Sequence, residues 1–165
     1  MYKLVSLCVL SWFSTIVNAT CNPNITPIAP NSRYELLNNG AEVKDSKTGL
    51  LWQRCSLGQT WNGTNCTGTA AIYRWASALQ TAANMGSGWR VPNVKELDSL
   101  VEQACYNPSI NEVIFPNVIS DSYWSSSPAV GNSSCALVVN FDNGNHAGCS
   151  GKYAFNYVRL VRSSQ

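Results

Sequence analysis

The stretch GWRVPNVKEL, residues 88–97, predicts where a helix begins and how the chain enters it. Pro92 biases the residue before it toward extended backbone, so the helix does not extend back through it. Asn93 is a good N-cap, and Glu96, three residues later, is its capping-box partner. The apolar residues that follow recur at helical spacing, which predicts a helix to about Gln103. Those residues are Val94, Leu97, Leu100 and Val101.

Trp89 and Arg90 lie in the extended segment before that helix. Successive side chains of an extended segment point to opposite sides. We therefore expect Trp89 to pack under the helix start, and the guanidinium of Arg90 to bind a carboxylate or a carbonyl group. The motif thus favours a structural role over a ligand site. It comprises Trp89, Arg90, Pro92, Asn93 and Glu96.

Another helix is predicted upstream, over residues 70–85. Ile72, Trp75, Leu79 and Ala83 recur on one face of it, and Gly86 is placed to end it. Three short β-like runs precede this helix and three follow the second one. They are RYELL (33–37), AEVKD (41–45), LLWQRC (50–55), SYWSSS (122–127), CALVVNFD (135–142) and FNYVRLVR (155–162).

The connections between these runs also carry signals. Turns are predicted at 38–40 and 46–49, and Asn143-Gly144 predicts a type I′ hairpin turn. The loop over 106–121 has a length that is typical of functional or strapped segments. Trp124 is expected in the core. The order of strands, two helices, long loops and strands predicts an α+β domain, with the helices packed on an antiparallel sheet.

The N-terminal residues 1–19 have the pattern of a secretory signal peptide, with Lys3, an apolar run, and a small-residue cleavage site that ends at Ala19. The apolar run is too short to span a membrane comfortably. Residues 20–32 then predict an extended arm, and residues 33–165 fit a single domain. The sequence therefore predicts an exported protein, whether secreted, periplasmic or at the cell surface, without a membrane span.

The charge of the mature chain is nearly balanced. Removing Lys3 leaves ten basic residues against nine acidic ones, and the basic residues form no cluster. Binding of nucleic acids needs a basic patch or stripe, so the sequence predicts no nucleic-acid partner.

Six cysteines remain after the signal peptide, an even number that predicts a disulfide framework in an exported chain. Six thiols allow fifteen pairings. Cys55 and Cys66 bracket a short loop, Cys135 and Cys149 bracket the predicted hairpin, and Cys21 and Cys105 are the remaining two. Zinc sites need CxxC-like or Cys/His spacing, which this sequence lacks, so no metal is predicted.

Five ordered motifs resemble the C-terminal domain family of the Lcl collagen-like adhesin. They are TGLLWQRCSLGQTWNGTNCTG (48–68), WRVPNVKEL (89–97), ACYNPSIN (104–111), YWSSSPA (123–129) and YVRLVR (157–162), and the resemblance covers about residues 33–162. It implies a C-type-lectin-like fold, in which N- and C-terminal strands pair near each other and long loops carry the binding surface. It also implies export, and the adhesin that names the family binds sulfated glycosaminoglycans. This chain contains no collagen-like repeat, and the Cys135 and Cys149 pair is an addition to the cysteines that fit the motifs.

The leading functional hypothesis is a binding module for a carbohydrate, a glycosaminoglycan or another surface ligand. Amides, hydroxyls and aromatic rings suit sugars, which need hydrogen-bonding groups and a ring on which to stack. The candidate binding residues are Tyr123, Asn140, Asp142, Asn145, Lys152, Tyr153 and Tyr157. No cofactor is predicted. Calcium is a narrower alternative carried by Asn140, Asp142, Asn143 and Asn145, although the Glu-Pro-Asn and Trp-Asn-Asp motifs of calcium lectins are missing.

Two further hypotheses come from other classes. Catalysis has little support, because the single histidine, His146, follows the predicted turn and no pair of facing carboxylates is visible. A redox enzyme would need Cys135 and Cys149 as free thiols. The second alternative is a structural or assembly subunit of a pilus or envelope, which binds another protein through the same polar loops.

Overall fold

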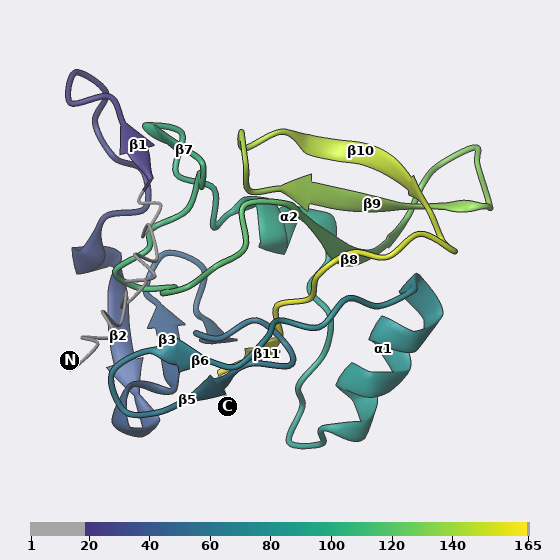
Figure 1. The fold of residues 1–165 in the computed structure, drawn as a ribbon, viewed down its shortest axis with the longest axis horizontal. Coiled ribbons are helices and arrows are strands. Elements are labelled where there is room, and N and C mark those ends of the chain that lie inside the picture. Colours follow the sequence, from purple (N-terminus) through teal and green to yellow (C-terminus); the bar gives the residue numbers. More distant parts are fainter. Residues whose placement is uncertain (1–18, 165) are drawn as a thin grey trace, which may run out of the picture.

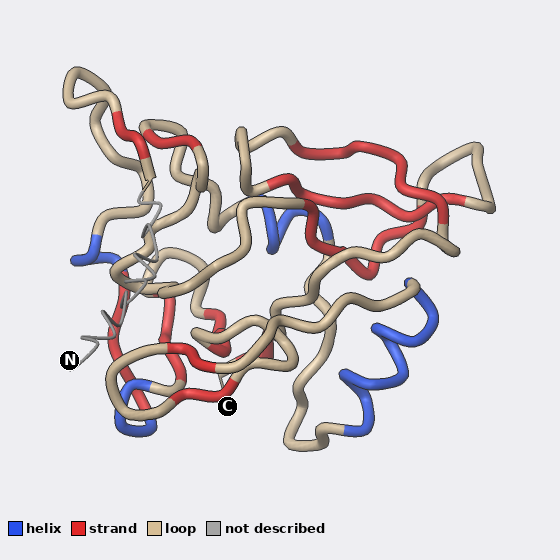
Figure 2. Tube along the Cα trace, viewed as in Figure 1, coloured by secondary structure: helices blue, strands red, loops and turns tan. Residues whose placement is uncertain are grey.

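The computed structural model describes residues 19–164, so residues 1–18 of the predicted signal peptide and Gln165 lie outside the described residues. The described chain is an α+β protein of two α-helices and several antiparallel sheets, as predicted (Figures 1 and 2). Its helices are α1 (Trp75–Asn84) and α2 (Val94–Asp98). Its strands are β1 (Thr20–Cys21), β2 (Tyr34–Leu37), β3 (Glu42–Asp45), β4 (Leu50–Gln53), β5 (Thr60–Trp61), β6 (Cys66–Thr67), β7 (Cys105–Tyr106), β8 (Ser122–Pro128), β9 (Cys135–Asn140), β10 (His146–Gly151) and β11 (Val161–Ser163).

One sheet has the strand order β11-β4-β3-β2 and joins the C-terminal strand to the N-terminal meander. The three predicted N-terminal runs are confirmed as β2, β3 and β4. The turn between β2 and β3 is a 3-10 segment, Asn38–Gly40, in which all three residues have positive φ. Asn and Gly tolerate that backbone region better than other residues. Val161 pairs with Trp52, so the last strand lies beside β4, as the family resemblance implies.

A second sheet has the order β10-β9-β8 (Figure 1). The predicted hairpin joins β9 to β10, but the prediction of a two-residue turn was wrong, because residues 141–145 all lie between the two strands. Phe141 explains the longer loop. Its side chain is fully buried, with its ring centroid 5.1 Å from that of Tyr123, and its carbonyl accepts a bond from the Ser109 N–H. Packing of Phe141 into the core therefore ends the ladder before the turn.

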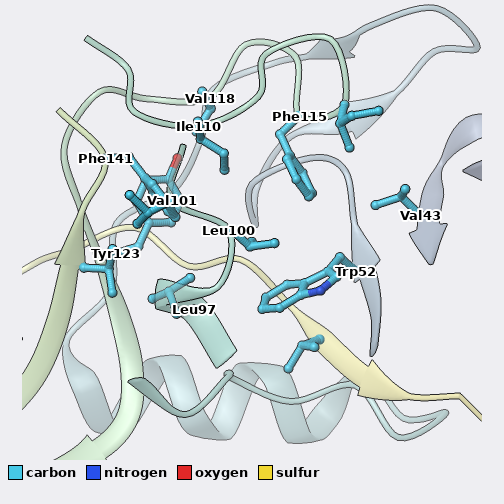
Figure 3. Packing of buried hydrophobic residues seen from close by; sticks show 13 residues of the cluster. Val43, Trp52, Leu97, Leu100, Val101, Ile110, Phe115, Val118, Tyr123 and Phe141 are labelled. Carbon is cyan, nitrogen blue, oxygen red and sulfur yellow. The ribbon is translucent and has the colours of Figure 1, made fainter. Parts of the chain in front are cut away.

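Two packed clusters form the core. The first lies between the two main sheets and centres on Trp52, Leu97, Leu100, Phe115 and Phe141 (Figure 3). The second lies under α1 and contains Ala78, Ala82, Trp89, Trp124 and Leu160. Trp124 is fully buried, as predicted, and its indole N–H donates to the Tyr73 carbonyl at 2.6 Å.

Both predicted helices exist, but each is shorter than the sequence pattern indicated. The first begins at Trp75 rather than at residue 70, because Tyr73 pairs with Asn156 in a β-bridge. The predicted apolar face was also displaced. Its buried residues are Ala78 and Ala82, whereas Ile72 precedes the helix and is 50% exposed.

Helix α2 ends at Asp98 instead of near Gln103, because the next residues are held by other parts of the chain. Val101 forms a β-bridge with Ile110. The buried carboxylate of Glu102 accepts the N–H groups of Ile28, Ala29 and Ala104. The predicted apolar residues of this segment nevertheless all pack in the first core cluster.

The motif that enters α2 is structural, as predicted. The side chain of Asn93 accepts the Glu96 N–H and the Glu96 carboxylate accepts the Asn93 N–H, which is a complete capping box. Arg90 donates two bonds of 2.7 Å to the same carboxylate. Burial opposes ionisation of Glu96, but the bonds from Arg90 and Asn93 outweigh it and hold the pKa of Glu96 below its ordinary value. Trp89 is buried beneath the guanidinium of Arg162, 4.6 Å from the ring centroid.

All three predicted cysteine pairs are disulfides, namely Cys21–Cys105, Cys55–Cys66 and Cys135–Cys149. In the chain-entropy model each stabilises the fold by about 3 to 5 kcal/mol. The long loop over 106–121 is strapped down by Arg54, whose guanidinium donates to the carbonyls of Ile114 and Val113 at 2.6 and 2.9 Å.

Candidate functional site

Five of the seven predicted binding residues divide between the two ends of the β9–β10 hairpin (Figure 1). Asn140, Asp142 and Asn145 lie in or beside the loop that joins the strands. Lys152 and Tyr153 follow β10 at the other end. A strand rises about 3.4 Å per residue, so a strand as long as β9 separates the two groups by roughly 17 Å. The two groups therefore form two separate surfaces.

Two of the predicted residues belong to the core. Tyr123 is fully buried, and its hydroxyl lies 2.8 Å from the Ser56 Oγ and accepts the Ile119 N–H at 3.1 Å. Burial raises the pKa of Tyr123. The ring of Tyr157 packs against it, with centroids 5.5 Å apart, and is itself only partly exposed. Tyr123 has no surface to offer a ligand in this structure.

The hairpin loop uses its polar side chains to hold its own backbone. Asn140 Oδ1 accepts the Asp142 N–H at 2.7 Å, and Asn143 Oδ1 accepts the Asn145 N–H at 3.0 Å. The Ser120 hydroxyl donates to Asp142 Oδ1 at 3.1 Å. These oxygens are the ones that the calcium alternative would require. Within residues 19–164, no group of three or more His, Cys, Asp or Glu side chains is placed to hold a metal ion.

The other end of the hairpin exposes aromatic side chains. Tyr153 is 81% exposed and Phe155 is 55% exposed. The Lys152 ammonium lies 4.5 Å from the centroid of the Trp75 ring. The Arg74 guanidinium lies 5.3 Å from the centroid of the Phe155 ring. We call these five residues, Arg74, Trp75, Lys152, Tyr153 and Phe155, the aromatic rim.

The backbone of the aromatic rim is fixed from both sides. The Trp75 N–H donates to the Lys152 carbonyl at 3.1 Å, which places the loop after β10 beside the start of α1 (Figure 1). Tyr73 and Asn156 exchange two backbone bonds of 2.9 and 3.1 Å. The indole N–H of Trp75 donates to the Ser125 carbonyl at 2.8 Å. The rim therefore presents its rings on a rigid support. This favours binding, because the loop loses less conformational entropy when a ligand binds.

The sequence pointed to only part of this surface. Lys152 and Tyr153 were predicted, whereas Phe155 was assigned to a strand, Trp75 to the buried face of a helix, and Arg74 to no role. One signal could have found Phe155: it stands two residues after Tyr153, and neighbours at that spacing share a face of an extended segment. Arg74 and Trp75 join the rim only through contacts with residues far along the chain, Phe155 and Lys152. Such contacts leave no pattern in the local sequence.

A separate hollow of about 400 Å³ lies between β4, β11 and the 87–90 segment. Arg90 and Arg162 line it. Each of these arginines is already paired with a carboxylate at 2.7 Å, Arg90 with Glu96 and Arg162 with Glu42. The hollow therefore has little uncompensated positive charge to offer an anion.

No curated protein matched the chain significantly. Among the helices of residues 19–164, none has the length and apolar character that a membrane crossing requires. The three disulfides fit an oxidising, extracytoplasmic compartment. The family model of the Lcl C-terminal domain matches residues 41–162, and the chain therefore belongs to that family.

Proposed function

We propose that this chain is an exported binding module that docks carbohydrate on the aromatic rim. One observation carries the proposal: Tyr153 and Phe155 are exposed on one loop, and each lies next to a residue of the same rigid support. Sugars bind by stacking the apolar faces of their rings on aromatic side chains.

The polar neighbours of these rings suit the same class of ligand. Lys152 and Arg74 supply hydrogen-bond donors beside the rings. Donors of this kind bind sugar hydroxyls and carboxylate or sulfate substituents. The hairpin loop with Asp142 and Asn145 is the second candidate surface, because both side chains are exposed.

Retention on immobilised polysaccharides tests this function. The panel includes neutral glycans, uronic-acid polymers and sulfated glycosaminoglycans. The mature protein is compared with Tyr153→Ala and Phe155→Ala, and each substitution is expected to weaken binding about 3- to 10-fold, the effect of losing one ring contact. Tyr106→Ala is the matched control, because Tyr106 is also aromatic and 57% exposed but lies on β7. Failure of every glycan to retain the protein, or equal binding by all variants, would contradict the proposal.

The alternative is an assembly subunit that binds another envelope protein. Both functions require the same rigid scaffold with exposed loops, so the fold alone does not separate them. Affinity capture from the envelope of the exporting cell distinguishes protein binding from glycan binding. Capture of one envelope protein that is insensitive to free sugar would favour assembly. Elution by free sugar would favour glycan binding.

A further inference from the structure

The start of the mature chain is held at a defined place. Thr20 pairs with Tyr106 and Cys21 pairs with Cys105 in the short β1–β7 sheet, and the disulfide joins the second pair (Figure 1). Just before them, the backbone N–H of Ala19 donates to Glu112 Oε2 at 2.5 Å. The carboxylate of Glu112 thus lies beside the predicted cleavage site that ends at Ala19.

Cleavage after Ala19 changes the chemistry at this place. It makes Thr20 the first residue, and an α-ammonium group with three donors and a positive charge replaces a neutral amide with one donor. Consecutive backbone nitrogens are about 3 to 4 Å apart, within the span of one residue, so the new group forms within reach of the same carboxylate. A charged donor adds Coulomb attraction to the hydrogen bond that the carboxylate accepts.

We propose that Glu112 is the binding site for the α-ammonium group that signal-peptide removal creates at Thr20. The pair would complete the docking of residues 20–32, the N-terminal arm, onto the domain. It would form only in the processed chain.

The surroundings of Glu112 favour this pairing. Glu112 lines a groove of about 510 Å³ between the arm and residues 102–113, whose walls include Ile25, Pro27 and Val113. Glu102 and Glu112 are the charged side chains that line the groove. Glu102 already accepts three backbone N–H groups, so it is committed to the arm further along. Apolar walls lower the local dielectric and strengthen an ion pair at the edge of the groove.

The pairing has a defined pH dependence. A paired α-ammonium has a folded pKa above the ordinary value of about 7.7 to 8.0. The stability that it contributes is therefore fully present below about pH 7.7 and is lost as the pH rises through the folded pKa. The α-ammonium is the group whose ordinary pKa lies in that range.

The test compares the secreted, processed protein with Glu112→Gln, which keeps an acceptor oxygen but removes the charge. The α-amine pKa is measured from the pH dependence of its acylation, followed by mass spectrometry of the N-terminal peptide. We expect it to be raised by about half a unit or more in the native protein and to return to the ordinary range in Glu112→Gln. Glu35→Gln on exposed β2 is the control and should leave it raised.

Three results would overturn the proposal. The first is a mature N-terminus other than Thr20. The second is an α-amine pKa that is the same in the native protein and in Glu112→Gln, and the third is a Tm that falls by the same amount in these two proteins between pH 7 and pH 10. None of these measurements uses a sugar ligand, so they stand apart from the test of glycan binding. An N-terminal extension before Thr20 provides the second variant, because it should lower the Tm of the native protein but not that of Glu112→Gln.

Discussion

The fully buried guanidinium of Arg159 lies 4.6 Å from the centroid of the Phe115 ring, and its Nη1 donates to the carbonyl oxygens of Gln53 and Arg54. Burial lowers the pKa of Arg159, but arginine keeps its charge at any ordinary pH. This arginine therefore ties the C-terminal segment to the end of β4 and to the residue that follows it, through a planar forked group that lysine lacks.

Arg159→Lys tests that relationship. A lysine keeps the charge but loses the fork and the ring contact, so we expect the free energy of unfolding to fall by about 2 to 4 kcal/mol in urea denaturation. Arg74→Lys, at an exposed position, should change it by less than about 0.5 kcal/mol. Equal stability of the two variants would show that the buried fork contributes nothing.

The buried ion pair of Arg33 and Asp45 predicts a limit to acid stability. Burial alone would raise the pKa of Asp45, but bonds from Arg33, Thr48 and the Lys47 N–H outweigh it and lower that pKa. The stability from this group is present above the unfolded value of about 3.9 and is lost as the pH falls through the folded pKa. Asp45→Asn should therefore cost about 3 to 5 kcal/mol at pH 7 and less at pH 2 to 3. Denaturant titrations at both pH values measure this, and an equal loss at both would be inconsistent with it.

The capping box at the start of α2 gives a smaller, local prediction. Asn93→Ala removes the acceptor for the Glu96 N–H, and should lower the free energy of unfolding by about 1 kcal/mol. Asn93→Asp, which keeps an acceptor oxygen, is the matched control and should lie close to the native protein. Thermal unfolding of the three proteins decides the point, since equal melting temperatures would remove the cap from the account.

The third disulfide predicts a stability effect without loss of the fold. Replacing both Cys135 and Cys149 by Ala opens a loop of 14 residues and should cost about 3 kcal/mol in the chain-entropy model. The core strands β8 and β9 remain paired, so the far-UV circular dichroism should stay near that of the native protein. A variant that no longer folds would show that the hairpin depends on this link for more than its entropy.

Local chemistry explains which parts of the fold the sequence could predict. The Asn93 and Glu96 cap, the Asn38–Gly40 turn and the three N-terminal strands depend on residues close in sequence. The early end of α2 could not be predicted, because the Glu102 carboxylate binds backbone N–H groups about seventy residues earlier in the chain. Phe141 was likewise predicted in a strand but lies just after β9, where its ring packs against Tyr123.

The same reasoning explains the mixed result for the candidate site. Alternation along a strand distinguishes a buried face from an exposed one only when one face is open to solvent. Tyr123, Trp124 and Ser125 are all buried, because both faces of this part of β8 are covered. No pattern in SYWSSS could therefore show that Tyr123 belongs to the core. The exposure of Tyr153 is easier to expect, because this residue lies in a loop and loops run over the protein surface.

The most direct test of the central claim compares the two ends of the β9–β10 hairpin in one binding titration. The claim is that the family motifs are scaffold and that the aromatic rim carries the ligand. We predict that Tyr153→Ala weakens binding of the best-retained polysaccharide about 3- to 10-fold without changing the Tm, whereas Asp142→Asn leaves binding unchanged. Loss of binding in Asp142→Asn, with native affinity in Tyr153→Ala, would contradict the account.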